Sequence, residues 1–243
     1  QRIGWHDYRR EIGQSLVCLV VFSLSAYIVL IGSSQGWMHL DTSGRATILE
    51  CAGVFVLMLV VHDAYFYWSH RLFHHPKVFR RFHLTHHKSV TPTPFASYSF
   101  DIPEAVVHAA FFPLWFGIVS TPVAVVQVFV IFALTRNVLG HTGVEILPRF
   151  TVDNVVLDQF TTTTHHDLHH TGHFRHNFGL YFTWWDRLMG TEHPRYKEVF
   201  REVTSRDGGD ARNAIAHDRN VQDTSVQDRG VEMWREHGTQ NPH

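Results

Sequence analysis

Histidines gather in three short clusters of this chain, at spacings that bring several rings to one side of a helix. The first cluster pairs two histidines four positions apart, and the second and third repeat the pattern H-x2-H-H. Residues three or four apart are neighbours on a helix surface, and neutral imidazole is a good ligand for iron, zinc and copper. The eight candidate ligands in these clusters are His70, His74, His83, His86, His87, His166, His169 and His170.

The number of clustered imidazoles predicts more than one metal ion. A structural zinc site takes four protein ligands, so eight imidazoles are enough for two ions. An isolated pair of histidines arises easily by chance, but three clusters beside apolar segments are poorly explained in that way. Six further histidines are expected to be exposed and to bind no metal, and these are His6, His39, His193, His217, His237 and His243.

Composition separates the chain into an apolar first part and a polar end. Its 243 residues are enough for one domain, and a formal net charge of −1 does not suggest a nucleic-acid partner. Cys18 and Cys51 both lie in apolar runs and favour neither a disulfide framework nor cysteine ligation of metal. We therefore expect a membrane-embedded domain over residues 1–198 and a polar, flexible tail over residues 199–243.

Four apolar stretches predict about four transmembrane helices. Residues 15–32 carry no charge, and residues 46–68 form a second span that continues as a helix to His74, because residues 65–74 contain neither Gly nor Pro. Residues 105–119 and 121–139 predict a helical hairpin whose two arms are each of marginal length for a full crossing. Arg136 and Asn137 are costly in lipid, so we expect them to face the protein interior or the cytoplasmic interface.

The basic residues orient these spans. They lie before the first span and in the polar segment 75–103, and the positive-inside rule makes both regions cytoplasmic. His141, which follows the last span, then emerges on the same side as the histidine clusters. The predicted fold is an all-α, multi-pass membrane protein with a cytoplasmic helical cap that holds a two-metal site. The basic residues behind this orientation are Arg9, Arg10, Lys77, Arg80, Arg81 and Lys88.

Three side chains near the clusters are candidates for further roles. Asp63 lies seven residues before His70 and almost on the same helix face, where a carboxylate can bond the far nitrogen of a metal-bound imidazole. His62 and His165 adjoin the clusters and are weaker candidates for metal ligands.

The nearly pure imidazole ligand set favours oxidative chemistry. The H-E-x-x-H motif of zinc hydrolases and the E-x-x-H motif of soluble di-iron bundles are both absent from the sequence. A histidine-rich pair of irons is suited to binding O2 and to taking hydrogen from an unactivated C–H bond. A lipid chain has no polar group near such a carbon, so acid–base catalysis alone cannot start the reaction.

The histidine motifs, taken as a set, resemble the fatty acid hydroxylase and sterol desaturase superfamily of membrane di-iron enzymes. The resemblance covers about residues 46–195 and rests on HDAYFYWSHRLFHH, RFHLTHH, THHDLHH and NFGLYFTWWDRLMGT. It implies two iron ions, which zinc can replace, with O2 as co-substrate and a lipid as substrate. It also implies an electron donor such as a cytochrome b5-like protein, a ferredoxin or a reductase, and His141 as a ninth ligand.

Two positions depart from the pattern of that superfamily. Asp101 stands where members often have a histidine, and it could alter the surroundings of the ligands or the substrate contacts. Glu145 stands four residues after His141, where relatives of the 2-hydroxylase type have a further histidine. Its carboxylate could bind metal or water, or could be an ordinary solvated side chain.

Several alternatives stay open on the sequence alone. Hydroxylation is slightly favoured over desaturation, but both begin with hydrogen abstraction. The lipid could be a sterol, a fatty acyl chain or a carotenoid, and the membrane could be a bacterial inner membrane or the endoplasmic reticulum. A membrane metal-binding or transport protein is the alternative from another class. A carrier would place its ligands within the spans, near the midplane, whereas these clusters follow the spans.

Overall fold

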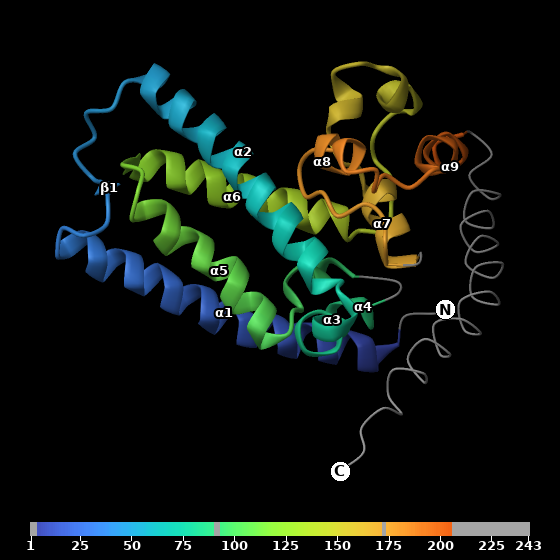
Figure 1. Ribbon diagram of the computed structural model, residues 1–243, viewed down its shortest axis with the longest axis horizontal. Coiled ribbons are helices and arrows are strands. Elements are labelled where there is room, and N and C mark those ends of the chain that lie inside the picture. Colours follow the sequence, from blue (N-terminus) through green and yellow to red (C-terminus); the bar gives the residue numbers. More distant parts are fainter. Residues whose placement is uncertain (1–3, 90–92, 172–173, 206–243) are drawn as a thin grey trace, which may run out of the picture.

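Long helices run side by side through most of the chain, and shorter helices cover one end of them (Figure 1). The computed structural model describes residues 4–89, 93–171 and 174–205. The long helices are α1 (Trp5–Ser34), α2 (Ile48–Phe73), α5 (Ile102–Phe116) and α6 (Val123–Gly140). At the end away from the short helices, β1 (Leu40–Asp41) pairs in parallel with β2 (Thr121–Pro122).

The short helices form a cap over the end of the long helices that lies away from β1 (Figure 1). Two of them, with the 3-10 helix η1, lie between α2 and α5 in the sequence, and the rest follow α6. The cap consists of α3 (Pro76–Phe82), α4 (Leu84–His87), η1 (Pro94–Tyr98), η2 (Arg149–Asp153), η3 (Leu157–Gln159), α7 (Thr163–Thr171), α8 (Trp184–Leu188) and α9 (Tyr196–Val203).

Three of the long helices are long and apolar enough to cross a membrane, namely α1, α2 and α6. The fourth predicted span corresponds to α5, whose 15 residues are fewer than the roughly 20 that a full crossing needs. The outer faces of these helices carry exposed apolar side chains such as Leu16, Leu114 and Ile131. Exposed leucines and isoleucines along such helices fit contact with lipid, so the predicted helical membrane fold is confirmed.

Aromatic rings fill the space between α2, α5 and α6. Phe111 and Trp115 of α5 stack with ring centroids 5.9 Å apart, and Phe129 of α6 lies 6.5 Å from Phe111. Met58 of α2 is fully buried among them. Because this core lies inside the bundle, the outward faces of the same helices are left for the membrane.

Helix α2 follows its predicted course to the cap. Thr47 and Glu50 form a capping box at its start, in which each side chain accepts from the backbone N–H of the other residue. The helix ends at Phe73 with His74 as its C-terminal cap residue. His70 and His74 therefore stand where α2 enters the cap, as the sequence predicted.

Polar residues tie the first helix to the cap. Helix α1 begins ten residues before the predicted span, and its Glu11 is fully buried, where it accepts hydrogen bonds from the hydroxyls of Ser89 and Thr93. One turn further on, Gln14 donates to the Phe100 carbonyl. The start of α1, the end of α2, the start of α5 and the end of α6 thus meet at one end of the bundle.

The last described helix extends the folded part past the expected boundary. That boundary, after residue 198, falls inside α9, where Val199 and Phe200 are buried against Val152 and Leu168. Helix α9 is strongly amphipathic, so its polar face hides its apolar face when composition is averaged along the sequence. For this reason the composition predicted a polar tail where the second half of α9 lies. The rest of the predicted tail, residues 206–243, lies outside the described residues.

The orientation of the cap can be tested by cysteine labelling. Lys88 is exposed beside α4, whereas Thr42 is exposed at the other end of the bundle. In a Cys51→Ser background, a membrane-impermeant thiol reagent should label Lys88→Cys only from the cytoplasmic side. Thr42→Cys should react only from the opposite side. Labelling of Lys88→Cys from the non-cytoplasmic side would contradict the predicted topology.

Candidate metal centre

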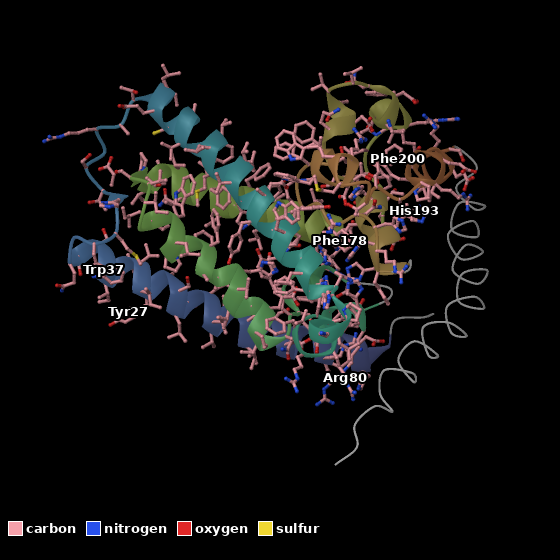
Figure 2. The ribbon with its side chains drawn as sticks, in the orientation of Figure 1. Tyr27, Trp37, Arg80, Phe178, His193 and Phe200 are labelled. Atoms are coloured by element: carbon pink, nitrogen blue, oxygen red, sulfur yellow. The ribbon has the colours of Figure 1, made fainter. Side chains whose placement is uncertain are left out.

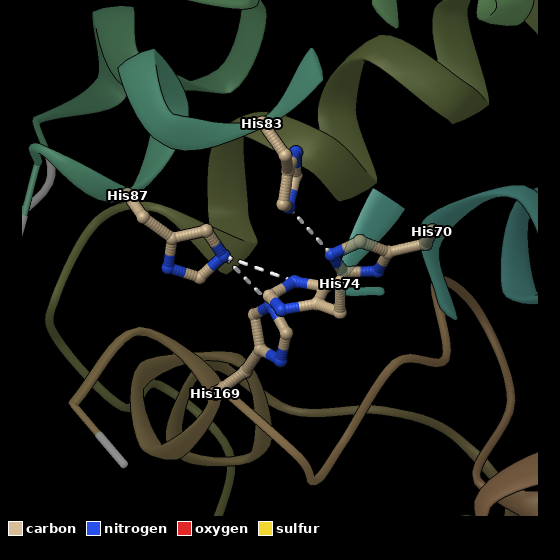
Figure 3. Close-up of side chains that lie close together, drawn as sticks. All are labelled: His70, His74, His83, His87 and His169. Atoms are coloured by element: carbon tan, nitrogen blue, oxygen red, sulfur yellow. Dashed lines mark hydrogen bonds between the residues drawn. The ribbon is translucent and has the colours of Figure 1, made fainter. Parts of the chain in front are cut away.

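All nine histidines predicted as ligands come together in two groups. Within each group, one ring nitrogen of every residue lies within 4.8 Å of the others. Figure 3 shows the larger group, with rings from separate segments turned toward one another. The larger group is His70, His74, His83, His87 and His169, and the smaller group is His86, His141, His166 and His170.

The spacing of the ring nitrogens fits ligation of a metal. With metal–nitrogen bonds of about 2.1 Å, neighbouring ligands lie about 3.0 Å apart around an octahedral ion and about 3.4 Å apart around a tetrahedral one. In the larger group the Nε2–Nε2 distances are 3.0 Å for His70–His83, 3.2 Å for His74–His87 and 3.2 Å for His87–His169. In the smaller group they are 3.5 Å for His86–His141, 3.0 Å for His141–His166 and 3.0 Å for His166–His170.

Each H-x2-H-H motif divides its rings between the two groups. The i,i+4 pair His83 and His87 joins the larger group, whereas His86 joins the smaller one. The second motif is the reverse, because its i,i+4 pair joins the smaller group and its middle residue, His169, joins the larger. Adjacent helical residues point about 100° apart, so two neighbouring histidines cannot aim at one ion.

The two groups are direct neighbours. The rings of His87 and His170, which belong to different groups, have centroids only 4.8 Å apart. His86 of the smaller group likewise lies next to His83 of the larger, at 5.1 Å between centroids. Two metal ions held by these groups would therefore form a pair that can act on one substrate.

Hydrogen-bond acceptors hold the far nitrogen of several rings. Nδ1 of His70 lies 3.0 Å from the carbonyl oxygen of Phe178. Nδ1 of His141 lies 2.7 Å from that of Asn137, and Nδ1 of His169 lies 2.7 Å from that of His176. A carbonyl accepts only from N–H, so each contact places the proton on Nδ1 and leaves the Nε2 lone pair free for a metal.

Burial keeps these rings neutral near pH 7. It lowers the pKa of His141 and of His169 to about 4, because the buried site disfavours the charged imidazolium. In the described residues no carboxylate belongs to either group. The donor set is therefore purely imidazole, and its charge has to come from the ions that it binds.

Glu104 is a supporting residue that the sequence analysis did not identify. Its carboxylate oxygen lies 2.8 Å from Nδ1 of His83, and both side chains are almost fully buried. The same oxygen lies 3.6 Å from Nε2 of His108, four residues along α5. The signal was present as an acidic residue directly before the apolar stretch 105–119 and a histidine inside it, groups that are costly in a membrane unless they have a role.

The predicted contact between Asp63 and His70 is wrong. Asp63 accepts hydrogen bonds from the backbone N–H groups of Tyr181 and Phe182 and from the indole N–H of Trp184. The far nitrogen of the His70 ring meets the Phe178 carbonyl instead, at 3.0 Å. Asp63 thus acts on His70 indirectly, by fixing the segment that carries this carbonyl.

A second buried carboxylate fixes the other end of that segment. Asp186 accepts from the backbone N–H groups of Phe178 and Gly179, at 2.9 and 2.8 Å. A side-chain carbon at Gly179 would lie 2.5 Å from the Phe182 carbonyl oxygen and 2.9 Å from the Asp186 carboxylate. Because these oxygens approach so closely, only glycine fits at this position. The resulting tight loop holds the Phe178 carbonyl in place.

Glu145 and Asp101 anchor helices and do not belong to either group. Glu145 accepts from the backbone N–H and the hydroxyl of Thr164, at the start of α7. Asp101 accepts from the backbone N–H and the hydroxyl of Thr85, at the start of α4. Carboxylates are favourable at helix N-termini, and these two secure the helices that carry both H-x2-H-H motifs.

The weaker ligand candidates lie outside both groups. His62 packs edge-on against Phe111, with ring centroids 4.5 Å apart. His165 is fully buried, its Nε2 lies 3.5 Å from the Asp186 carboxylate, and burial lowers its pKa to about 3. Both histidines are part of the packed interior around the site.

The remaining histidines follow the prediction only in part. His6 and His39 are exposed as expected. His193 is 7 % exposed, so its predicted exposure is wrong; its ring lies against that of His176, which no spacing rule would show. His217, His237 and His243 lie outside the described residues.

Removal of a ligand from either group should lower the metal content without affecting the ion of the other group. We expect two ions per wild-type chain, iron in the active form and zinc after overexpression, because imidazole sites rank zinc above Fe(II). His74→Ala removes a ligand of the larger group and His141→Ala one of the smaller, so each variant should lose about one ion. The measurement is metal analysis of purified protein whose helical content is unchanged. His39→Ala is the matched control, and a His74→Ala protein that keeps both ions would contradict the grouping.

The contact between Glu104 and His83 should tune metal binding. Glu104→Gln keeps the side-chain volume but replaces the carboxyl group beside Nδ1 of His83 with an amide, so metal affinity should fall by roughly 10–100-fold. Competition with a chelator measures this affinity directly. Glu50→Gln, at the far end of α2, should leave it unchanged. Equal affinity for wild type and Glu104→Gln would show that this carboxylate does not support the ligand.

Comparison with known proteins agrees with this geometry. The model of the family described as fatty acid hydroxylase matches residues 55–191. Delta(7)-sterol 5(6)-desaturase erg3B of Aspergillus fumigatus is 26% identical over 197 residues, which is 80% of this chain and 56% of that protein. Lathosterol oxidase of Homo sapiens is 28% identical over 189 residues, 76% of this chain and 61% of that protein. Methylsterol monooxygenase 1 of Gallus gallus is 33% identical over 136 residues, 55% of this chain and 44% of that protein.

These matches cover different shares of the chain and of its relatives. The chain spans little more than half the length of the sterol desaturases it matches. No solved structure matches it. The family model, in contrast, covers more than half of the chain and contains all nine histidines of the two groups. The chain belongs to the fatty acid hydroxylase family.

Proposed function

We propose that this protein is an O2-dependent oxidoreductase that uses two irons to hydroxylate or desaturate an unactivated C–H bond of a membrane lipid. The observation that carries the proposal is the pair of adjacent, purely imidazole groups at the end of the membrane helices. Relatives named as sterol desaturases and sterol monooxygenases support the choice of reaction and favour a sterol-like lipid.

The residues of this chain have defined parts in such a reaction. Bound iron supplies the activation of O2 that acid–base groups cannot. The nine imidazoles hold the ions through Nε2, while Glu104 and the carbonyls of Phe178, Asn137 and His176 keep the rings in position. Burial of the rings excludes water from the site, which protects a reactive oxidant from side reactions.

A pocket beside the smaller group is where the reacting carbon would lie. It reaches the rings of His141 and His166. Its other walls come from Leu180 and from residues at the end of α6, including Arg136, whose guanidinium is bonded to the Thr161 carbonyl. Arg136 and Asn137 thus face the protein interior, where their polar groups are satisfied.

The transport alternative is less well supported. A carrier would hold its metal near the middle of the membrane helices and would need a path through them. Here His74 and His141 follow the last residues of α2 and α6, and the remaining rings apart from His70 come from the cap. Family membership also favours oxidation over transport.

The cap also offers a surface for an electron donor. Three basic residues of α3, Lys77, Arg80 and Arg81, are exposed, and Figure 2 shows Arg80 at the edge of the cap. A basic surface attracts an acidic redox protein by long-range electrostatics. We place this surface on the cytoplasmic side, in the endoplasmic reticulum or a bacterial inner membrane.

The test is the change in lipids that the protein causes. In cells that express it, mass spectrometry should find a lipid that gains one oxygen atom or loses two hydrogens, and 18O2 labelling separates the two outcomes. His86→Ala should abolish the product, because a ring of the smaller group is lost, while His39→Ala should leave it unchanged. A product that forms without O2, or with full yield in His86→Ala, would refute the proposal.

A further inference from the structure

A larger pocket lies between the membrane helices and adjoins the one at the metal groups. About 490 Å³ of space, part of it open to the surroundings, lies between the side chains that line it. Asn137 and Leu180 line both pockets, so the two lie on either side of these residues. The larger pocket has a mostly aromatic wall, which includes Phe22, Phe66, Phe100, Phe112 and Phe129.

Three polar side-chain atoms in this apolar wall have no hydrogen-bond partner among the described residues: the Tyr181 hydroxyl, Nδ1 of His62 and Nε2 of His108. The hydroxyl of Tyr181 is buried and unpaired, although the whole residue is only 1% exposed. Nδ1 of His62 is also buried and unpaired, and the two rings lie 5.6 Å apart between centroids. Buried polar groups are nearly always hydrogen-bonded, so a neighbouring pair of unpaired ones needs an explanation.

Packing alone does not explain these two residues. The His62 ring lies against Phe111 and Phe129, at 4.5 and 5.3 Å between centroids, and a phenylalanine would make the same contacts without a buried polar atom. His62 is also inside α2, a helix suited to crossing a membrane, where ionisable groups are costly and mark functional sites. The pocket has to receive a partner for these atoms from outside the chain.

We propose that the larger pocket binds the lipid substrate, and that His62 and Tyr181 hydrogen-bond a hydroxyl group which that lipid already carries. A phenol and an imidazole can each donate or accept, and an alcohol does both. This inference rests on the proposed function, in which the other end of the lipid is oxidised at the two histidine groups.

The geometry also orients the bound lipid. His62 precedes His70 by eight residues, or about 12 Å along α2, and the smaller pocket leads from Leu180 to His141 and His166. The hydroxyl therefore lies toward the membrane side of the pocket, and the carbon to be oxidised lies toward the cap. A hydrocarbon that lacks the hydroxyl would leave two buried polar atoms unpaired and should bind more weakly.

Binding of matched lipid pairs tests this inference without turnover. The pairs are lathosterol with cholest-7-ene, and 1-octadecanol with octadecane; in each pair the second member lacks only the hydroxyl. Iron-loaded protein in nanodiscs, kept free of O2, should bind the alcohol of at least one pair about tenfold or more tightly than the hydrocarbon. Tyr181→Phe and His62→Phe should each reduce that preference toward one, with metal content unchanged.

A tyrosine on the same helix provides the matched control. Tyr65→Phe removes a hydroxyl that is bonded to the Val107 carbonyl and does not line the pocket, so it should keep the preference. No preference in wild type for either pair, or an intact preference in the Tyr181→Phe/His62→Phe double variant, would overturn the inference.

The outcomes also separate this inference from the proposed function. Oxidation of lipids without any alcohol preference would refute the pocket assignment alone. An alcohol preference without any O2-dependent product would refute the proposed function alone.

Discussion

Nine imidazole rings share one buried volume, and each has to turn a neutral nitrogen inward. Burial supplies the neutrality, because it lowers the pKa of rings such as His141 and His169. Direction comes from acceptors behind the rings, of which the Phe178, Asn137 and His176 carbonyls are backbone groups. The site therefore requires the backbone itself to be placed accurately, and much of the surrounding structure does this.

Buried and half-buried carboxylates provide part of that placement. Asp63 and Asp186 hold the loop around Gly179 from both sides, while Asp101 and Glu145 hold the starts of α4 and α7. Each accepts backbone N–H groups, so its charge is satisfied without contact to a metal. Glu104, in contrast, contacts the His83 ring of the larger group directly. Acidic residues here serve as anchors, and the ligand positions are left to neutral histidines.

The membrane helices position the chemistry and give it access to lipid. Their ends meet at the cap, so histidines from α2, from the residue after α6 and from the cap helices can converge. The same helices enclose an aromatic pocket that adjoins the site. A lipid in this pocket would have its carbon skeleton among the helices and its reacting carbon at the cap, which suits a reaction at an unactivated C–H bond.

Local spacing and composition were enough to identify the eight clustered histidines, the course of α2 to His74 and the membrane character of the long helices, whereas His141 was identified as a ligand only through the resemblance of the motifs to a known superfamily. These features depend on residues near one another in the sequence. The tertiary structure alone decided how the rings divide, since adjacent residues such as His86 and His87 point in directions about 100° apart. It also decided the partners of Asp63, Asp101 and Glu145, and the burial of His193. Those depend on segments up to 121 positions away, such as Trp184 against Asp63, and no periodicity in the sequence encodes which distant N–H group a carboxylate will meet.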